Sequence, residues 1–220
     1  MVTFDAEEMF WKNVYTECDA MRKIVWGSDA KTFNKDTDKT AAFITAMLDI
    51  TKEDVVLDYG CGLGRLMKAV VPNAKHVVGL DVSNSIIAMS DKYLDGVKNV
   101  NTIHCSSIAE SPVGDTSIDK IYSFIVMQHV SKYKCFFILE NLKKYLTPGG
   151  KGLFQFPDLM KSDNTYRGYA QTNVFNGDNN CSLHFWTKEE AKKIFEMAGW
   201  KVVDIVDDVE TGTDFWVVAE

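Results

Sequence analysis

Short apolar runs alternate with segments of helical periodicity along most of this chain. Runs rich in Val, Ile and Leu predict strands at residues 54–58, 76–81, 99–104, 119–127 and 151–156. Apolar positions at helical spacing predict helices between these strands, over 64–71, 84–94 and 132–146, the last ended by the Thr-Pro-Gly-Gly segment at 147–150. Near-continuous apolar strands that alternate with helices indicate a parallel sheet covered on both faces.

The two ends of the chain follow other patterns. Helical spacing predicts N-terminal helices over 7–21 and 38–49. Near the C-terminus, Thr187 and Glu190 form a capping-box pattern for a helix that ends at Ala198. Two strands follow, at 200–206 and 213–219, and their short connection requires an antiparallel pair. We therefore expect a single domain over 1–220, with helices in the N-terminal segment 1–50 and a long insertion at 157–186.

Three glycines follow the first predicted strand, at Gly60, Gly62 and Gly64, directly after Asp58 and Tyr59. Glycine loses more conformational freedom on folding than any other residue, so alternating glycines at a strand end indicate close approach of the backbone to a ligand. The helix that follows offers free N–H groups at its N-terminus. The second strand ends in Asp81, whose carboxylate could accept hydrogen bonds from ribose hydroxyls. These features predict a nucleoside-type cofactor site at the carboxyl ends of the strands.

The glycine spacing favours one cofactor over another. The dinucleotide fingerprint is G-x-G-x-x-G, whereas this chain has G-x-G-x-G preceded by an acid, Asp58. A carboxylate in that position repels a pyrophosphate but suits a cationic amino-acid group. S-adenosylmethionine carries an ammonium, a carboxylate and a sulfonium and no phosphate. An NAD-dependent oxidoreductase therefore stays as the least favoured alternative.

Composition narrows the compartment and the partners. The chain has 220 residues, of which 46% are hydrophobic, and 24 basic against 31 acidic side chains give a net charge of −7. Without a basic run, nucleic acid and anionic membranes are poor partners. Five widely spaced cysteines with no C-x-x-C pair argue against a zinc knuckle or a disulfide framework and suit the cytoplasm. The acidic N-terminus is unlike a signal peptide, and no apolar run is long enough to span a bilayer.

The segment VVLDYGCGLGRL at 55–66 resembles motif I of the class I S-adenosylmethionine-dependent methyltransferases. The resemblance extends over 40–220 and includes the second-strand acid motif at 78–83 and the Leu-Thr-Pro-Gly-Gly turn at 146–150. It also includes Met-Gln-His-Val at 127–130. It implies a Rossmann-like α/β fold with a doubly wound seven-stranded sheet in the order 3-2-1-4-5-7-6. Strand 7 would be antiparallel, and helices would cover both faces. The N-terminal helices at 1–50 would form a variable cap, and the insertion at 157–186 would cover the acceptor site.

The resemblance also implies which residues bind the cofactor. Asp58 would lie near the ammonium, and Asp81 would hold the ribose hydroxyls. Apart from the resemblance, the charges of Arg22 and Arg65 make them candidate carboxylate partners, and a surface or helix-end charge is the open alternative for each. Many relatives carry an Asp after the third strand for the adenine amino group, whereas this chain offers Ser106, a weaker acceptor. The full expected set is Asp58, Gly60, Cys61, Gly62, Arg65, Asp81, Val82, Ser106, Ser107, Ile108, Ser123 and Phe124.

Methyl transfer needs alignment of donor and acceptor, and a base if the acceptor carries a proton. The candidate bases are His129, just past the fourth strand, and His184, at the end of the insertion; a packing role is the open alternative for each. No Asp/His cluster suggests a magnesium site, so a metal-independent enzyme is expected.

The acceptor is expected to be a small polar molecule methylated on oxygen or nitrogen. No N/D-P-P-Y/F motif follows the fourth strand, and none of the cysteines follows a proline, so the patterns of nucleic-acid methyltransferases are missing. A protein or peptide acceptor, or a catalytically silent cofactor-binding subunit, stays open, as does the oligomeric state.

Overall fold

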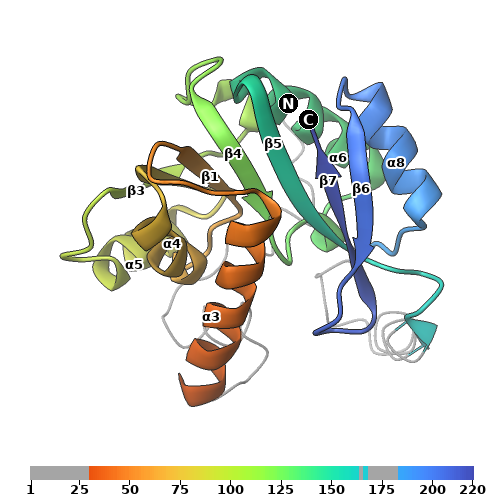
Figure 1. The fold of residues 1–220 in the computed structure, drawn as a ribbon, viewed down its shortest axis with the longest axis horizontal. Helices are drawn as coiled ribbons and strands as arrows, with labels where there is room; N and C mark the ends of the chain where they lie inside the picture. Colours follow the sequence, from red (N-terminus) through yellow and green to blue (C-terminus); the bar gives the residue numbers. More distant parts are fainter. Residues whose placement is uncertain (1–29, 164–165, 168–182) are drawn as a thin grey trace.

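A computed structural model of the chain describes residues 30–163, 166–167 and 183–220 (Figure 1). The predicted helix at 7–21 and most of the predicted insertion at 157–186 lie outside these residues. The helices are α3 (Ala30–Met47), α4 (Arg65–Val70), α5 (Asn84–Tyr93), α6 (Lys132–Tyr145) and α8 (Lys188–Met197), with 3-10 helices η1 (Val71–Asn73), η2 (Ile108–Glu110) and η3 (Met127–His129). The strands are β1 (Val55–Tyr59), β2 (His76–Asp81), β3 (Val100–His104), β4 (Ile118–Ser123), β5 (Leu146–Pro157), β6 (Val202–Asp207) and β7 (Asp214–Ala219).

The strands form one sheet in the order β3-β2-β1-β4-β5-β7-β6. The pairs from β3 to β5 are parallel, and β7 runs antiparallel to both β5 and β6. Because parallel strands share an edge for their carboxyl ends, the loops after β1, β2, β3 and β4 meet at one edge of the sheet. The predicted strand order and the antiparallel strand 7 are confirmed.

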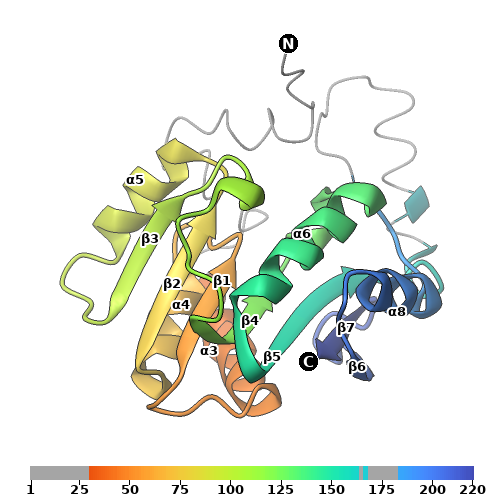
Figure 2. The same ribbon diagram turned by 90° about the horizontal axis from the view of Figure 1, so that it is seen from above.

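The core has two parts, one on each face of the sheet (Figure 2). On β7, Phe215 and Val217 pack with α6 and α8, whereas Trp216 between them packs with α3 and α4 on the opposite face. The same alternation separates Val56 from Leu57 on β1. This period of two places successive side chains on opposite faces, so both faces are apolar and covered by helices.

Two predicted boundaries are wrong around β4 and β5. The strand expected over 119–127 ends at Ser123, because Ile125 takes a positive φ of 59° and the chain then enters η3. The Thr-Pro-Gly-Gly segment at 147–150 is not a separate turn but lies inside β5, where the pairing register with β4 shifts. The side chain of Asp119 holds this irregular region, since it accepts hydrogen bonds from Val55 N and Thr147 Oγ1 at 2.8 and 3.0 Å.

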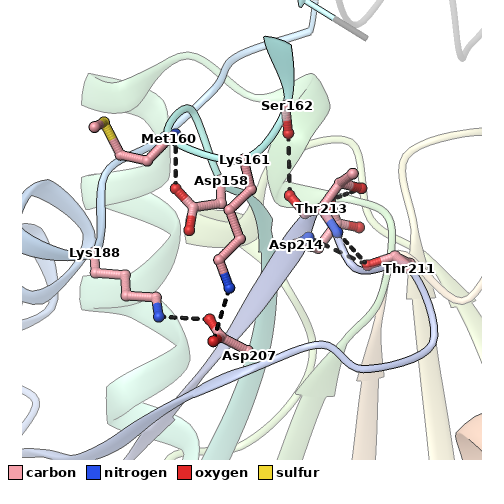
Figure 3. Close-up of polar contacts among 9 residues, drawn as sticks. All are labelled: Asp158, Met160, Lys161, Ser162, Lys188, Asp207, Thr211, Thr213 and Asp214. Atoms are coloured by element: carbon pink, nitrogen blue, oxygen red, sulfur yellow. Dashed lines mark hydrogen bonds and ion pairs between the residues drawn. The ribbon is translucent and has the colours of Figure 1, made fainter. Parts of the chain in front are cut away.

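The two ends of the predicted insertion leave and rejoin the fold together. Asp158 and Trp186 form an isolated parallel bridge, in which Trp186 N donates to Pro157 O at 3.0 Å and Leu159 N donates to Trp186 O at 2.8 Å. The outgoing end also binds the turn between β6 and β7, because Ser162 Oγ donates to Thr213 O at 3.1 Å (Figure 3). These contacts fix both ends near the carboxyl end of β5. None of the helices in the described part of the chain is long and apolar enough to cross a membrane.

Candidate cofactor site

A cavity of about 340 Å³ lies where β1, β2, β3 and β4 end. Its walls come from the glycine turn after β1, the ends of β2 and β3, the segment after β4, and one face of α6. The lining residues include twelve of the fourteen that the sequence singled out: Asp58, Gly60, Cys61, Gly62, Arg65, Asp81, Val82, Ser106, Ser107, Ile108, Phe124 and His129. The residues that the sequence singled out therefore lie together around one cavity at this edge of the sheet.

The floor of the cavity is the glycine turn. Gly60, Gly62 and Gly64 all have positive φ, at 79°, 54° and 79°. The N–H groups of Gly60 and Cys61 both donate to Leu80 O, at 2.8 and 3.0 Å, which fixes the turn against β2. A Cβ atom on Gly60 would lie 2.2 Å from Val126 Cγ2, so this position excludes any side chain. Glycine is required here by both its backbone conformation and its close approach to the segment after β4.

Asp58 places a carboxyl group at the cavity wall. Its side chain is buried and accepts a 2.9 Å hydrogen bond from Tyr122 Oη. Burial raises its pKa to about 7, against the opposing effects of the Tyr122 hydrogen bond and the positive charge of Arg65. In the absence of a bound cation, this group therefore changes its charge near neutral pH.

Asp81 connects the end of β2 to the glycine turn. Its Oδ2 accepts a hydrogen bond from Gly62 N at 3.1 Å, and its Oδ1 accepts one from Ser83 N at 2.9 Å. Burial raises the pKa of Asp81, and the hydrogen bonds from Ser83 and Gly62 oppose that shift. Each carboxylate oxygen has a further lone pair, so the group can still accept hydrogen bonds from a ligand's hydroxyls.

Arg65 and Phe124 form another part of the cavity wall. The guanidinium Cζ lies 5.2 Å from the centre of the Phe124 ring, and Arg65 Nη1 donates to Thr37 Oγ1 on α3 at 3.0 Å. The Phe124 ring stacks in turn on Trp216, with 5.6 Å between ring centroids and 7° between ring planes. A planar guanidinium held this way beside the glycine turn is well suited to bind a carboxylate.

The loop after β3 closes the third side. Cys105 Sγ lies within hydrogen-bond distance of Ser107 O, at 3.1 Å, and Tyr145 Oη donates to Ile108 O at 2.8 Å. Ser106 and Ser107 are exposed and line the cavity together with Val82 and Ile108. This side combines apolar surface with hydroxyl groups, which suits a purine ring.

Two predicted residues do not line the cavity. Ser123 is fully buried, and its hydroxyl donates to Tyr59 O at 3.0 Å, a link between β4 and β1. The backbone N–H of His184 donates to Gln128 O at 2.7 Å. His184 therefore adjoins the segment that carries His129. Of these two histidines, only His129 lines the cavity.

Sequence reasoning missed the contribution of α6. Lys134, Phe137 and Ile138 on α6 all line the cavity. Their spacing is that of one helix face, which was visible in the sequence. The spacing could not show that this face looks toward the loop after β3 rather than toward the sheet. Within the described residues, no group of three or more His, Cys, Asp or Glu side chains could hold a metal ion.

Comparison with known proteins agrees with this geometry. Residues 56–150 match a family model described as a methyltransferase domain. Phosphoethanolamine N-methyltransferase 1 of Triticum aestivum is 24% identical over 153 residues, which cover 63% of this chain and 31% of that protein. Malonyl-[acyl-carrier protein] O-methyltransferase of a Marinomonas species is 27% identical over 127 residues, covering 54% and 46%. The chain thus spans less than half the length of these two relatives.

Among solved structures, the magnesium protoporphyrin IX methyltransferase of Synechocystis PCC 6803 with bound SAH superposes with a TM-score of 0.71. It is 14% identical, and the match covers 96% of each chain, so it shows a shared fold. The sheet order, the cavity at its carboxyl edge and the glycine turn are those of the class I S-adenosylmethionine-dependent methyltransferase fold. Its residues 56–150 carry the methyltransferase domain of the matching family.

Proposed function

We propose that this protein transfers the methyl group of S-adenosylmethionine to an oxygen or nitrogen atom of a small polar acceptor. The proposal rests on the cavity. Its lining combines the glycine turn with the carboxyl groups of Asp58 and Asp81 and the guanidinium of Arg65. S-adenosylmethionine supplies a methyl group already activated by a sulfonium. The chain has to bind this cofactor, align the acceptor with it and remove a proton where the acceptor carries one.

The charges of the cavity match those of the amino-acid end of the cofactor. Asp58 would hold the ammonium, because an ionised carboxyl group buried beneath the glycine turn is stabilised by a cation. Arg65 would hold the carboxylate from the wall that it shares with Phe124. Asp81 would accept hydrogen bonds from the ribose, and the loop after β3 would flank the adenine.

The proton acceptor in this proposal is His129. Its side chain is buried and lines the cavity, and its Nε2 accepts a 3.1 Å hydrogen bond from Gln128 Nε2, so this amide would have to release Nε2 before that nitrogen takes a proton. The backbone hydrogen bond from His184 to Gln128 O fixes the segment next to this ring. His184 would therefore support the position of His129 from the returning end of the insertion.

Two of the relatives support attack by nitrogen or oxygen. Their names specify an N-methyltransferase for phosphoethanolamine and an O-methyltransferase for malonyl-[acyl-carrier protein]. The first acceptor is a small amine, and the second is an acyl group on a carrier protein. We therefore favour small amines and hydroxy or carboxylic acids as the first acceptors to test with this chain.

The experiment begins with titration calorimetry of S-adenosylmethionine, S-adenosylhomocysteine and NADH in parallel. We expect micromolar binding of the first two and none of NADH. Gly62→Arg, which places a long side chain at a cavity-lining position with positive φ, should abolish that binding. Binding of NADH alone would overturn the proposal in favour of an oxidoreductase.

A second step measures transfer from methyl-labelled S-adenosylmethionine to pools of small amines, hydroxy acids and carboxylic acids. Gly62→Arg is the control, and turnover that survives in this variant would contradict the site. Transfer only to protein or peptide pools would point to a protein methyltransferase. Tight binding with no transfer to any pool would point to a silent cofactor-binding subunit.

A further inference from the structure

The segment after β4 carries a strained residue beside the cavity. Ile125 has φ of 59°, a conformation that a β-branched residue adopts rarely and at a cost. Ile125 and the preceding Phe124 both line the cavity. A strained conformation of this kind persists only where surrounding contacts hold it. The contacts that hold this pair of residues therefore bear on the shape of the cofactor site.

One of these contacts comes from Gln155 on β5. The backbone N–H of Ile125 donates to Gln155 Oε1 at 3.2 Å. Gln155 Nε2 donates to Asp208 Oδ2 at 2.7 Å, so both ends of the amide are engaged. The side chain is only 2% exposed and does not line the cavity. A polar side chain buried this deeply costs free energy unless its hydrogen bonds are made.

The second contact supports Phe124 through Trp216 and depends on the same oxygen, Asp208 Oδ2. Trp216 Nε1 donates to Asp208 Oδ2 at 3.0 Å, and the indole ring stacks on the Phe124 ring. The other oxygen of Asp208 accepts the backbone N–H groups of Glu210 and Thr211, at 3.0 and 3.2 Å. The turn between β6 and β7 therefore holds Asp208 through contacts that do not involve Gln155 or Trp216.

We propose that Gln155 and Asp208 are positioning residues for the cofactor site: together they set the placement of Phe124 and Ile125. One buried oxygen of Asp208 supports both cavity residues, each through a single intermediate side chain. The inference rests on the proposed function, because it assigns these contacts to the binding of S-adenosylmethionine.

The effect should be confined to one end of the ligand. The ring of Phe124 packs against Arg65, the proposed partner of the cofactor's carboxylate. A displaced Phe124 would therefore disturb the amino-acid end of the ligand. The adenosine end would contact Val82 and the loop after β3, and within the described residues no hydrogen bond of Gln155 or Asp208 reaches these. A general loss of structure would weaken both ends together.

The test compares two ligands in the variant Gln155→Leu. S-adenosylhomocysteine has the amino-acid end, and 5′-methylthioadenosine lacks it. We expect Gln155→Leu to weaken S-adenosylhomocysteine about tenfold while the affinity for 5′-methylthioadenosine stays within about twofold. The conservative variant Asp208→Asn keeps the shape but presents an amide in place of one acceptor oxygen. It should shift the two affinities in the same direction as Gln155→Leu, and by a smaller factor.

The control is Trp200→Phe, which removes a different buried hydrogen bond. In the wild type the indole N–H of Trp200 donates to Leu139 O at 2.9 Å, and neither residue lines the cavity. It should lower the melting temperature and leave both affinities unchanged. Unaltered binding of S-adenosylhomocysteine by folded Gln155→Leu, or an equal loss for both ligands, would overturn the inference. Wild-type protein that binds neither ligand would refute the proposed function itself.

Discussion

Asp58 on β1 and Tyr122 on β4 stand opposite each other in the sheet and are joined by a 2.9 Å hydrogen bond from the phenol to the carboxyl group. Both side chains are buried, and burial raises the pKa of Tyr122 well above its usual value. The phenol therefore stays protonated throughout the neutral range and donates a hydrogen bond to Asp58. A donor that is always present helps to stabilise the ionised carboxylate next to the cofactor cavity.

The first prediction concerns the pH dependence of cofactor binding. The pKa of Asp58 is about 7 in the ligand-free protein, and pairing with the cofactor's ammonium should lower it. Binding then favours the ionised form, so affinity should be constant above about pH 8 and fall by up to tenfold per pH unit below pH 7. Calorimetry of S-adenosylhomocysteine between about pH 6 and 9, in buffers of different ionisation enthalpy, measures both the affinity and the released proton.

Two variants separate Asp58 from other groups that titrate in this range. Tyr122→Phe removes a hydrogen bond that lowers the pKa of Asp58, so the fall in affinity should begin at a higher pH. Asp58→Asn should bind more weakly and lose this pH dependence. An unchanged pH profile in Asp58→Asn would assign the titration to another group.

The second prediction tests the glycine floor with a matched pair of positions. Gly60 and Gly96 have nearly the same φ, at 79° and 77°, but a Cβ on Gly60 meets Val126 at 2.2 Å while one on Gly96 meets nothing within 4 Å. Gly96→Ala should cost about 1 kcal/mol of unfolding free energy and keep full cofactor affinity. Gly60→Ala should cost several kcal/mol and abolish binding. Urea unfolding and calorimetry on both variants check this; equal effects would mean that only backbone strain matters.

The third prediction assigns Arg65 to the carboxylate of the cofactor. Arg65→Met removes the guanidinium that lies over Phe124 and donates to Thr37. S-adenosylhomocysteine should bind at least about tenfold more weakly, while 5′-methylthioadenosine, which has no carboxylate, should bind as before. Arg65→Lys keeps the charge without the fork of donors and should be intermediate. Equal losses for the two ligands in Arg65→Met would place this residue outside ligand recognition.

Local patterns in the sequence predicted the strand positions and the glycine turn, whereas the sheet order was implied by the resemblance to a known family. Apolar runs, glycine spacing and the acids at strand ends are patterns of residues that lie near one another in the chain. These patterns indicated Asp58, the glycine turn and Asp81 as parts of the site. The predictions failed where distant contacts override the local pattern. The apolar run after Ser123 looked like strand, but Ile125 is held in a positive-φ conformation by Gln155, which lies 30 residues away.

Ser123 shows the same limit at the level of a single side chain. It was expected to bind the cofactor from within a strand over 119–127, whereas it is the last residue of β4 and is fully buried. Its hydroxyl is used within the sheet, against Tyr59 O, rather than at the cavity. The contribution of α6 was missed for a related reason, since a helical face in the sequence does not reveal which neighbour it meets.

The fourth prediction concerns stability and two aspartates that flank the turn between β6 and β7, Asp207 at the end of β6 and Asp214 at the start of β7 (Figure 3). Burial, and then the charges of Asp208 and Asp158, raise the pKa of Asp214 to about 6. Ion pairs with Lys161 and Lys188 lower the pKa of Asp207 to about 2. The two carboxyl groups should therefore contribute to the pH dependence of unfolding with opposite signs.

For Asp214 the folded pKa exceeds the unfolded value of 3.8, so its stabilising contribution is complete below about pH 4 and is lost as the pH rises through 6. Asp214→Asn stays uncharged and should be more stable than the wild type above pH 6, by on the order of 1 kcal/mol, with no difference near pH 4. Asp207→Asn should be less stable than the wild type at neutral pH, and that difference should disappear as the pH falls toward 2. Urea unfolding at several pH values measures all three proteins. A destabilised Asp214→Asn at pH 7.5 would show that its ionised form is favoured by a contact stronger than the cost of its burial.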